Sequence, residues 1–248
     1  MGHGRVVDAM FLDGLEDAYD KGRLMGTFAE DCAQAYQFSR EAQDAYALRS
    51  LERARAAMRT GAFADEIAPV TVKAGKREAI VAADEQPPKA RPEKIPTLKP
   101  AFRDGGTVTA ANSSSISDGA AALVLTRESE AVRRGVAPLG RIVGHATYAA
   151  APKDFPTAPI GAIRRLFDRT GWSAGAVDLY EINEAFAVVA MAAMRDLDLP
   201  PDKVNVNGGA CALGHPIGAS GARILVTLIA ALCIGGGEGT AMAVELAE

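Results

Sequence analysis

The sequence predicts an α/β fold built in layers, with a mostly parallel sheet and helices on its faces. Two observations support this prediction. From residue 140 onwards, apolar runs of strand length alternate with longer stretches of helical period. The chain has 248 residues, of which 48% are hydrophobic and 23% charged, an ordinary composition for one large globular domain or two smaller ones.

The N-terminal part of the chain is predicted to be helical. Apolar residues recur at helical spacing across 6–15, and Thr27 followed by Glu30 fits a capping box. Ser39 is expected to open a long helix that Gly61 ends.

Short strands are predicted at 70–72 and 79–82, followed by a proline-rich stretch at 84–100. Its five prolines predict an extended loop rather than a helix or a paired strand. The basic residues among the prolines are Lys89, Arg91, Lys94 and Lys99. This loop is either a solvated connector or a docking site for a phosphorylated ligand.

The remainder of the chain alternates between strands and helices. Strands are predicted at 107–110, 120–126, 140–147, 177–182, 204–206, 231–235 and 241–246, and helices at 128–134, 160–170, 184–197 and 218–229. Glycines between the last two strands suit a tight antiparallel return. The apolar run 225–234 has no turn between helix and strand, so the two are collinear or a short segment is missing.

Charge and cysteine content exclude several classes of protein. A net charge of −4 argues against a nucleic-acid surface, which would need a basic face. Cys32, Cys211 and Cys233 are too few and too scattered for a disulfide framework or a zinc site. No apolar run reaches membrane-spanning length and no leader is recognised. We therefore expect a cytoplasmic or organelle-matrix protein without a metal.

The first candidate site is Asn183-Glu184-Ala185-Phe186, where a predicted strand passes into a helix. Ligand sites in α/β sheets form at the carboxyl ends of strands. Asn183 could instead cap the helix that follows.

The second candidate site lies in 208–221, where His215 stands among glycines before a helix. Gly214 permits backbone geometry that other residues resist, and Pro216 fixes the chain after the histidine. So much backbone specification around one imidazole favours a catalytic role over a structural one. The glycine spacing matches neither a dinucleotide fingerprint nor a P-loop.

The third candidate site is Cys233, which leaves an apolar strand and enters the glycines 235–237. A buried cysteine is commonly an inert apolar residue. Glycine-rich backbone beside a thiol can instead present N–H groups to an oxyanion.

These three clusters, in this order, resemble the C-terminal signatures of the thiolase family. The matching motifs are N-E-A-F from Asn183, G-H-P-I-G-A-S-G at 214–221 and C-I-G-G-G at 233–237. The resemblance extends to Met25-Gly26, 27–33, 107–112 and 118–121, and so covers essentially the whole chain. It implies a thiolase-like layered α/β fold, seen as the C-terminal half plus the helical and loop-rich insertion. The implied domains are a substrate-covering loop domain at 1–116, a remnant strand-helix of the N-terminal half at 117–136 and the C-terminal domain at 137–248.

The resemblance implies roles for individual residues. His215 would deprotonate a nucleophilic cysteine, Cys233 would exchange protons with the substrate, and Asn183 with His215 would stabilise an enolate oxygen. The N–H of Gly235 would contribute to a second oxyanion site. Coenzyme A would contact Ser114, Met25, Phe102, Ala185 and Phe186, with Lys89, Arg91 and Lys94 as candidates for its phosphates. The substrates would be coenzyme A thioesters, without a further cofactor.

The chain departs from the family pattern at its start, because the segment with the nucleophilic cysteine is not found. Cys32 is not expected to replace it, since Glu30 and Asp31 beside it would raise its pKa. Leu24 and Phe155 also differ from residues common in the family.

Three functions stay open. The first is a thiolase-type acyltransferase acting on acetyl-CoA or 3-oxoacyl-CoA, as a truncated chain. The second is a non-catalytic acyl-CoA-binding remnant or partner subunit, and the third, a hydrolase using His215 and Cys233, fits poorly. We expect a homo-oligomer or a chain that supplies the missing N-terminal segment, since the apolar strand 120–126 would otherwise be exposed.

Overall fold

The computed structural model describes residues 2–75, 77–227, 230–234 and 237–247. For residues 74 and 230–234 it describes the backbone but not the side chains. The predicted helix-to-strand join at 228–229 and the candidate residue Gly235 lie outside these residues.

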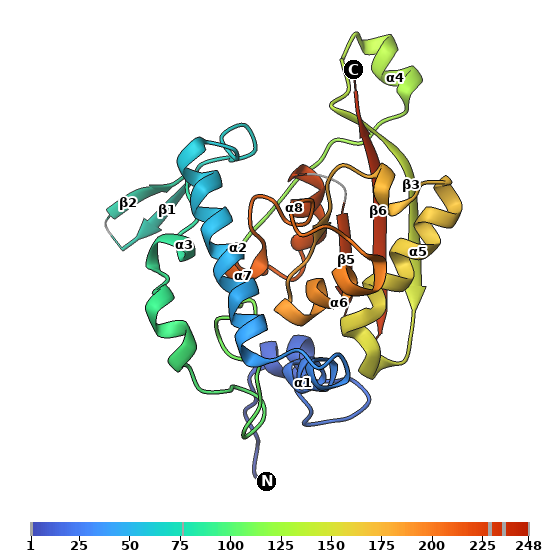
Figure 1. Ribbon diagram of the computed structural model, residues 1–248. Helices are drawn as coiled ribbons and strands as arrows, with labels where there is room; N and C mark the ends of the chain where they lie inside the picture. Colours follow the sequence, from blue (N-terminus) through green and yellow to red (C-terminus); the bar gives the residue numbers. More distant parts are fainter. Residues whose placement is uncertain (1, 76, 228–229, 235–236, 248) are drawn as a thin grey trace.

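A four-stranded sheet forms the centre of the C-terminal part (Figure 1). Its order is β3 (Gly140–Ala149), β6 (Glu238–Leu246), β5 (Ala230–Ile234) and β4 (Glu181–Ile182). The prediction of a mostly parallel sheet is wrong, because β6 pairs antiparallel with both β3 and β5. Among the described strands of this sheet only β4 and β5 are parallel, and the chain between them passes through helices, as the crossover between two parallel strands requires.

Helices cover this sheet and build the core. Helix α5 (Ala158–Thr170) lies against β3 and β6. Helix α6 (Ala187–Leu197) contributes several fully buried side chains, including Val188 and Val189, and contacts α1 (Met25–Ala35), α2 (Arg40–Thr60) and α5. The predicted ends of α2 are confirmed. Ser39 accepts a hydrogen bond from the Ala42 N–H at 3.2 Å, and Gly61 adopts a left-handed conformation.

Two helical predictions near the N-terminus are wrong in detail. Thr27 bonds to the Leu24 carbonyl, and the buried Glu30 carboxylate accepts from the backbone N–H groups of Thr107 and Val108, so no capping box forms. Across 6–15 the chain is helical only from residue 9, as a short turn leading into the π-helical turn η1 (Phe11–Leu15). Its apolar side chains are largely exposed to solvent.

The proline-rich stretch is more regular than predicted. The two short strands predicted ahead of it are confirmed as β1 (Val70–Ala74) and β2 (Arg77–Val81), and the structure pairs them antiparallel. After them come a helical turn α3 (Gln86–Lys89) and a 3₁₀ turn η2 (Pro92–Thr97). Each begins with proline in its first turn, where the missing N–H has no helical partner to lose.

Shorter elements connect the main ones. They are η3 (Pro152–Thr157), η4 (Ala174–Ala176), α7 (Ala210–Leu213) and α8 (Ser220–Thr227). The strands predicted at 107–110 and 204–206 do not form. The second is reduced to one bridge, between Tyr180 and Val204.

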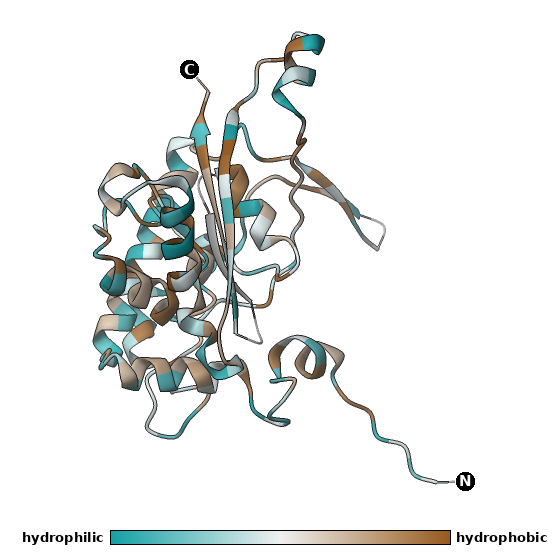
Figure 2. Ribbon diagram, turned by 90° about the vertical axis from the view of Figure 1, so that its right-hand side faces the viewer, coloured by the Kyte–Doolittle hydropathy of each residue, from teal (hydrophilic) through white to brown (hydrophobic). Residues whose placement is uncertain are grey.

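The apolar run 120–126 is extended but unpaired, so the strand predicted there does not form. Val124 is 98% exposed and Leu125 72% exposed. The run leads into α4 (Glu128–Arg134), which has the predicted bounds and stands apart from the helical layer (Figures 1 and 2). The exposure expected for this segment is therefore present in the described residues.

Candidate active site

The backbone conformation of Gly214 places His215 in the site. Gly214 follows α7 with φ +91° and ψ 169°, a conformation open essentially only to glycine. A Cβ at this position would lie 2.1 Å from the Ser117 hydroxyl oxygen. The chain then turns so that the His215 N–H donates to the Ser115 carbonyl at 3.1 Å. The backbone around His215 is thus restricted because Gly214 and His215 pack closely against residues 115–117.

The His215 imidazole is held on both sides. Its Nδ1 lies 2.6 Å from the hydroxyl oxygen of Ser220, the first residue of α8. Its Nε2 lies 3.4 Å from the amide Nδ2 of Asn183. The structure therefore brings together His215 and Asn183, which are 32 residues apart in the sequence.

The environment of His215 favours the neutral ring. Burial lowers the pKa of His215 to about 4, and the positive charge of Arg223 acts in the same direction. At neutral pH the ring therefore has one nitrogen without a proton, as a general base requires.

Asn183 does not cap a helix, so the capping role that the sequence left open for it is wrong. It directly follows β4 and is 4% exposed, with its amide facing His215. Helix α6 begins only at Ala187, and its N-cap, Phe186, makes no side-chain capping bond. Asn183 thus lies at the carboxyl end of a strand of the sheet, as a ligand-site residue is expected to.

Glu184 fixes the loop that carries Asn183. Its fully buried carboxylate accepts hydrogen bonds from the Tyr46 and Ser50 hydroxyls at 2.8 and 2.7 Å. It also accepts from the Asn205 amide at 2.8 Å and the Cys211 N–H at 3.1 Å. The sequence showed Glu184 only as a member of its motif, because all four donors come from distant segments.

The predicted coenzyme A residues lie beside this loop. Ser114 donates from both its N–H and its hydroxyl to the Ala185 carbonyl, each at 3.0 Å. The rings of Phe102 and Phe186 meet edge to face, with centroids 5.9 Å apart. The half-buried Met25 precedes Gly26, where a Cβ would overlap the Phe102 ring at 2.3 Å. All five residues therefore belong to one region beside the loop that carries Asn183.

Three further predicted residues are Cys233, Gly235 and Lys89. Cys233 lies in β5 with its backbone opposite Gly239 of β6, and its side chain is outside the described residues, as is all of Gly235. Lys89 forms an ion pair with Glu85 at 3.2 Å on the exposed face of α3.

Neither Cys32 nor Cys211 has the character of a nucleophile. Burial raises the pKa of Cys32 to about 12, with a smaller contribution from the Asp196 charge. The expected direction is confirmed, but the cause is burial rather than the neighbouring carboxylates. Burial and the Glu184 carboxylate raise the pKa of Cys211 well above its ordinary value.

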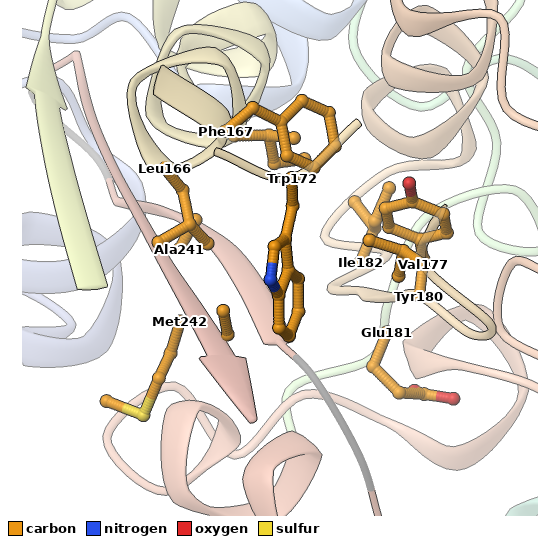
Figure 3. Close-up of a pocket in the computed structure, with 11 residues that line it drawn as sticks. Leu166, Phe167, Trp172, Val177, Tyr180, Glu181, Ile182, Ala241 and Met242 are labelled. Carbon is orange, nitrogen blue, oxygen red and sulfur yellow. The ribbon is translucent and has the colours of Figure 1, made fainter. Parts of the chain in front are cut away.

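Two hollows lie near these elements. An open one of about 480 Å³ begins at Pro216, the residue after His215, and is lined by Ser117, Asp118, Gly119, Ala120, Ala121, Pro216, Ile217, Gly218, Ala219 and Ala222. The second is a small, partly open apolar cavity between α5 and the sheet, where the Trp172 indole faces Leu166, Tyr180 and Ala241 (Figure 3). This apolar cavity contains none of the predicted site residues, and the Glu181 carboxyl group at its margin points away from Trp172.

The described residues contain no helix long and apolar enough to cross a membrane. They also contain no group of three or more His, Cys, Asp or Glu side chains arranged to hold a metal ion.

Comparison with known proteins gave consistent matches over the whole chain. The family model for the thiolase N-terminal domain matches residues 1–129, and that for the thiolase C-terminal domain matches 136–246. The acetyl-CoA acetyltransferases of Shinella zoogloeoides and Paracoccus denitrificans are 50% and 48% identical over 99% of this chain and 66% of their own length.

Solved structures agree. The Bacillus anthracis acetyl-CoA acetyltransferase superposes with a TM-score of 0.95 at 42% identity, over 100% of this chain and 66% of its own. The Acat5 thiolase of Ascaris suum, in complex with coenzyme A, gives a TM-score of 0.89 at 38% identity, over 99% of this chain and 66% of its own. The chain thus spans slightly less than two thirds of the length of these relatives.

Proposed function

The chain belongs to the thiolase family, and from this premise we propose that it is an acyltransferase acting on coenzyme A thioesters. The expected layered fold is shared with the family's solved structures. The proposed reaction is Claisen condensation of acetyl-CoA or its reverse, thiolysis of a 3-oxoacyl-CoA. The names of the relatives and the coenzyme A complex of one of them support this choice of substrate.

The observation that carries the proposal is the neutral His215 facing Asn183. A thiol transfers its proton to His215, and the resulting thiolate attacks the thioester carbonyl to form an acyl-enzyme, while Cys233 donates its proton to the departing coenzyme A, which leaves as a thiol. Cys233, now a thiolate, then removes an α-proton from the second thioester, and His215 keeps the proton that it accepted. The enolate oxygen is stabilised by donors at Asn183 and the protonated His215, before the enolate carbon attacks the acyl group. Gly235 is proposed to donate its N–H to the oxygen of the acyl intermediate.

The nucleophilic thiol needs a source other than Cys32 or Cys211, whose raised pKa values disfavour the thiolate. We propose that it belongs to the third of the relatives' length that this chain does not span, on the same polypeptide or another chain. The same observation favours one alternative function, an acyl-CoA-binding remnant or partner subunit without activity of its own.

Acyl transfer from radiolabelled acetyl-CoA separates the two functions. The natively purified protein, with any chain that co-purifies, is first characterised by intact mass. Label retained as a thioester and lost in His215→Ala supports the acyltransferase. Equilibrium binding of acetyl-CoA without label transfer or condensation, in a sample containing every co-purifying chain, would instead support the binding function.

We place the protein in the cytoplasm, because its cysteines suit a reducing compartment. We also propose that it assembles into a homo-oligomer or with a chain that supplies the nucleophile. The exposed apolar side chains of 123–125 support an assembly of this kind. No cofactor beyond the coenzyme A thioester is proposed.

A further inference from the structure

We propose that Ser220 is a positioning residue that holds the neutral His215 in one tautomer, with the proton on Nδ1 and the lone pair on Nε2. The proposal deepens the function proposed above and rests on it in one respect only: that function makes the Nε2 lone pair the acceptor of the thiol proton. The tautomer itself is a property of the folded chain that can be measured without any reaction.

The contacts of Ser220 support this assignment. Ser220 is 2% exposed, so its hydroxyl must find partners within the protein. The hydroxyl oxygen lies 2.6 Å from His215 Nδ1 and 3.1 Å from the Pro216 carbonyl oxygen. Because a carbonyl can only accept, the Ser220 proton is donated to Pro216. The hydroxyl lone pair is then left to accept from an N–H at Nδ1.

The contact at the opposite nitrogen points the same way. Asn183 presents its Nδ2, a donor, at 3.4 Å from Nε2. With the proton on Nδ1, Asn183 donates to the Nε2 lone pair and every group in the chain of contacts has a complementary partner. With the proton on Nε2, two donors would face each other unless the Asn183 amide turned over. The arrangement from Asn183 to Pro216 is therefore consistent with one tautomer.

The local sequence explains how the serine reaches the ring. The backbone N–H groups of Ala219 and Ser220 both donate to the Pro216 carbonyl, which closes the turn that begins α8. This turn brings the side chain of Ser220 back to a ring five residues earlier in the chain. One turn later, Arg223 places a positive charge that disfavours a second proton on the imidazole. The G-H-P-I-G-A-S-G motif thus holds both the imidazole and the group that orients it.

A proton held on Nδ1 leaves Nε2 free to act as the base. A base must present an unprotonated nitrogen to the thiol, and the Nε2–H tautomer would present a donor on the Asn183 side instead. Loss of Ser220 should therefore lower kcat by about tenfold or more, while KM for the thioester changes little. A purely structural role would change folding or KM and leave the tautomer as it was.

The test is nitrogen-15 NMR of the imidazoles at neutral pH. The chain has only three histidines, His3, His145 and His215, and the His215→Asn variant identifies the signal of interest. In the wild-type protein we expect the protonated nitrogen to be Nδ1. In Ser220→Ala we expect a mixture or a majority of the Nε2–H form, and in Ser220→Thr, which keeps the hydroxyl, a return towards the wild-type pattern.

Ser113→Ala is the matched control. Ser113 is also buried and near the site, but its hydroxyl donates to the Thr109 carbonyl, so its loss should leave the tautomer of His215 unchanged. Nε2–H as the main wild-type form, or an unchanged tautomer in a folded Ser220→Ala, would overturn the proposal. If Ser220→Ala does not fold, the wild-type spectrum and the spectrum of Ser220→Cys show whether Ser220 holds the tautomer. Cysteine is similar in size to serine and is a weaker hydrogen-bonding group. Absent acyl transfer would count against the proposed function and leave the tautomer result standing.

Discussion

Tyr46, in the middle of α2, donates its hydroxyl to the buried carboxylate of Glu184, which is 138 residues later and next to Asn183. The same carboxylate accepts from Ser50, one turn further along α2. Helix α2 and the loop that positions the Asn183 amide are therefore fixed to one another by a single buried charge. Any change at this carboxylate should affect both the stability of the fold and the geometry of the site.

Glu184→Gln should be strongly destabilising. Glu184 Oε1 accepts from the Tyr46 hydroxyl and the Asn205 amide, and Oε2 accepts from the Ser50 hydroxyl and the Cys211 N–H. A glutamine NH₂ would thus oppose a nitrogen donor in either orientation. We expect a loss of about 2–4 kcal/mol in the free energy of unfolding, measured by urea denaturation.

Tyr46→Phe is the control for this change, because it removes one donor and leaves the others in place. We expect it to cost about 1–2 kcal/mol. Equal stability of Glu184→Gln and wild type would show that the carboxylate does not organise this loop.

Gly214→Ala should displace His215. The alanine Cβ would need a backbone conformation open to glycine and would overlap the Ser117 hydroxyl. We expect a destabilisation of about 2–3 kcal/mol, together with a changed His215 imidazole signal in NMR spectra. Gly218→Ala is the matched control in the same motif. A Cβ there has no heavy atom within 4 Å, so stability should change by less than about 1 kcal/mol.

Stability should depend on pH through two buried groups with opposite signs. Burial lowers the pKa of His215 from 6.5 to about 4, so the unfolded chain binds more protons and stability falls as pH drops from about 6.5 towards 4. Burial raises the pKa of Glu181 from 4.5 to about 8, so its contribution to stability is complete below pH 4.5 and is lost as pH rises through 8. Between pH 4.5 and 6.5 a rise in pH therefore increases stability through His215 and decreases it through Glu181.

Variants should separate these slopes in urea denaturation measured at several pH values. His215→Asn should flatten the acid side, and Glu181→Gln should flatten the fall between about pH 6.5 and 8. The shift at His215, from 6.5 to about 4, corresponds to roughly 3 kcal/mol as an upper bound. Unchanged slopes in both variants would contradict these assignments.

The apolar run ahead of α4 should drive association. Val124 and Leu125 are largely exposed, and a segment of this composition without a partner favours contact with other chains. Sedimentation velocity of the purified chain should show oligomers or aggregates, and Val124→Asp with Leu125→Asp should reduce them. Val6→Asp, at a position 99% exposed on the N-terminal segment, is the control and should not. A well-behaved wild-type monomer would contradict this prediction.

Elements with signals inside a single turn could be predicted from the sequence. Ser39 and Gly61 set the ends of α2, and the bounds of α4 were also predicted, because caps and left-handed glycines act on neighbouring N–H and carbonyl groups. The motif around His215 was recognisable for the same reason, since Gly214 and Pro216 restrict the backbone locally.

Only the tertiary structure decided the partners of the polar side chains. Glu30 could have closed a capping box, but it accepts backbone N–H groups 77 and 78 residues away. Asn183 could have capped α6, but it faces His215. The antiparallel order of the sheet likewise depends on which strands meet after the chain has folded. A buried polar group binds whichever donor packing brings within reach, and that choice involves residues too distant in sequence for any local pattern to encode.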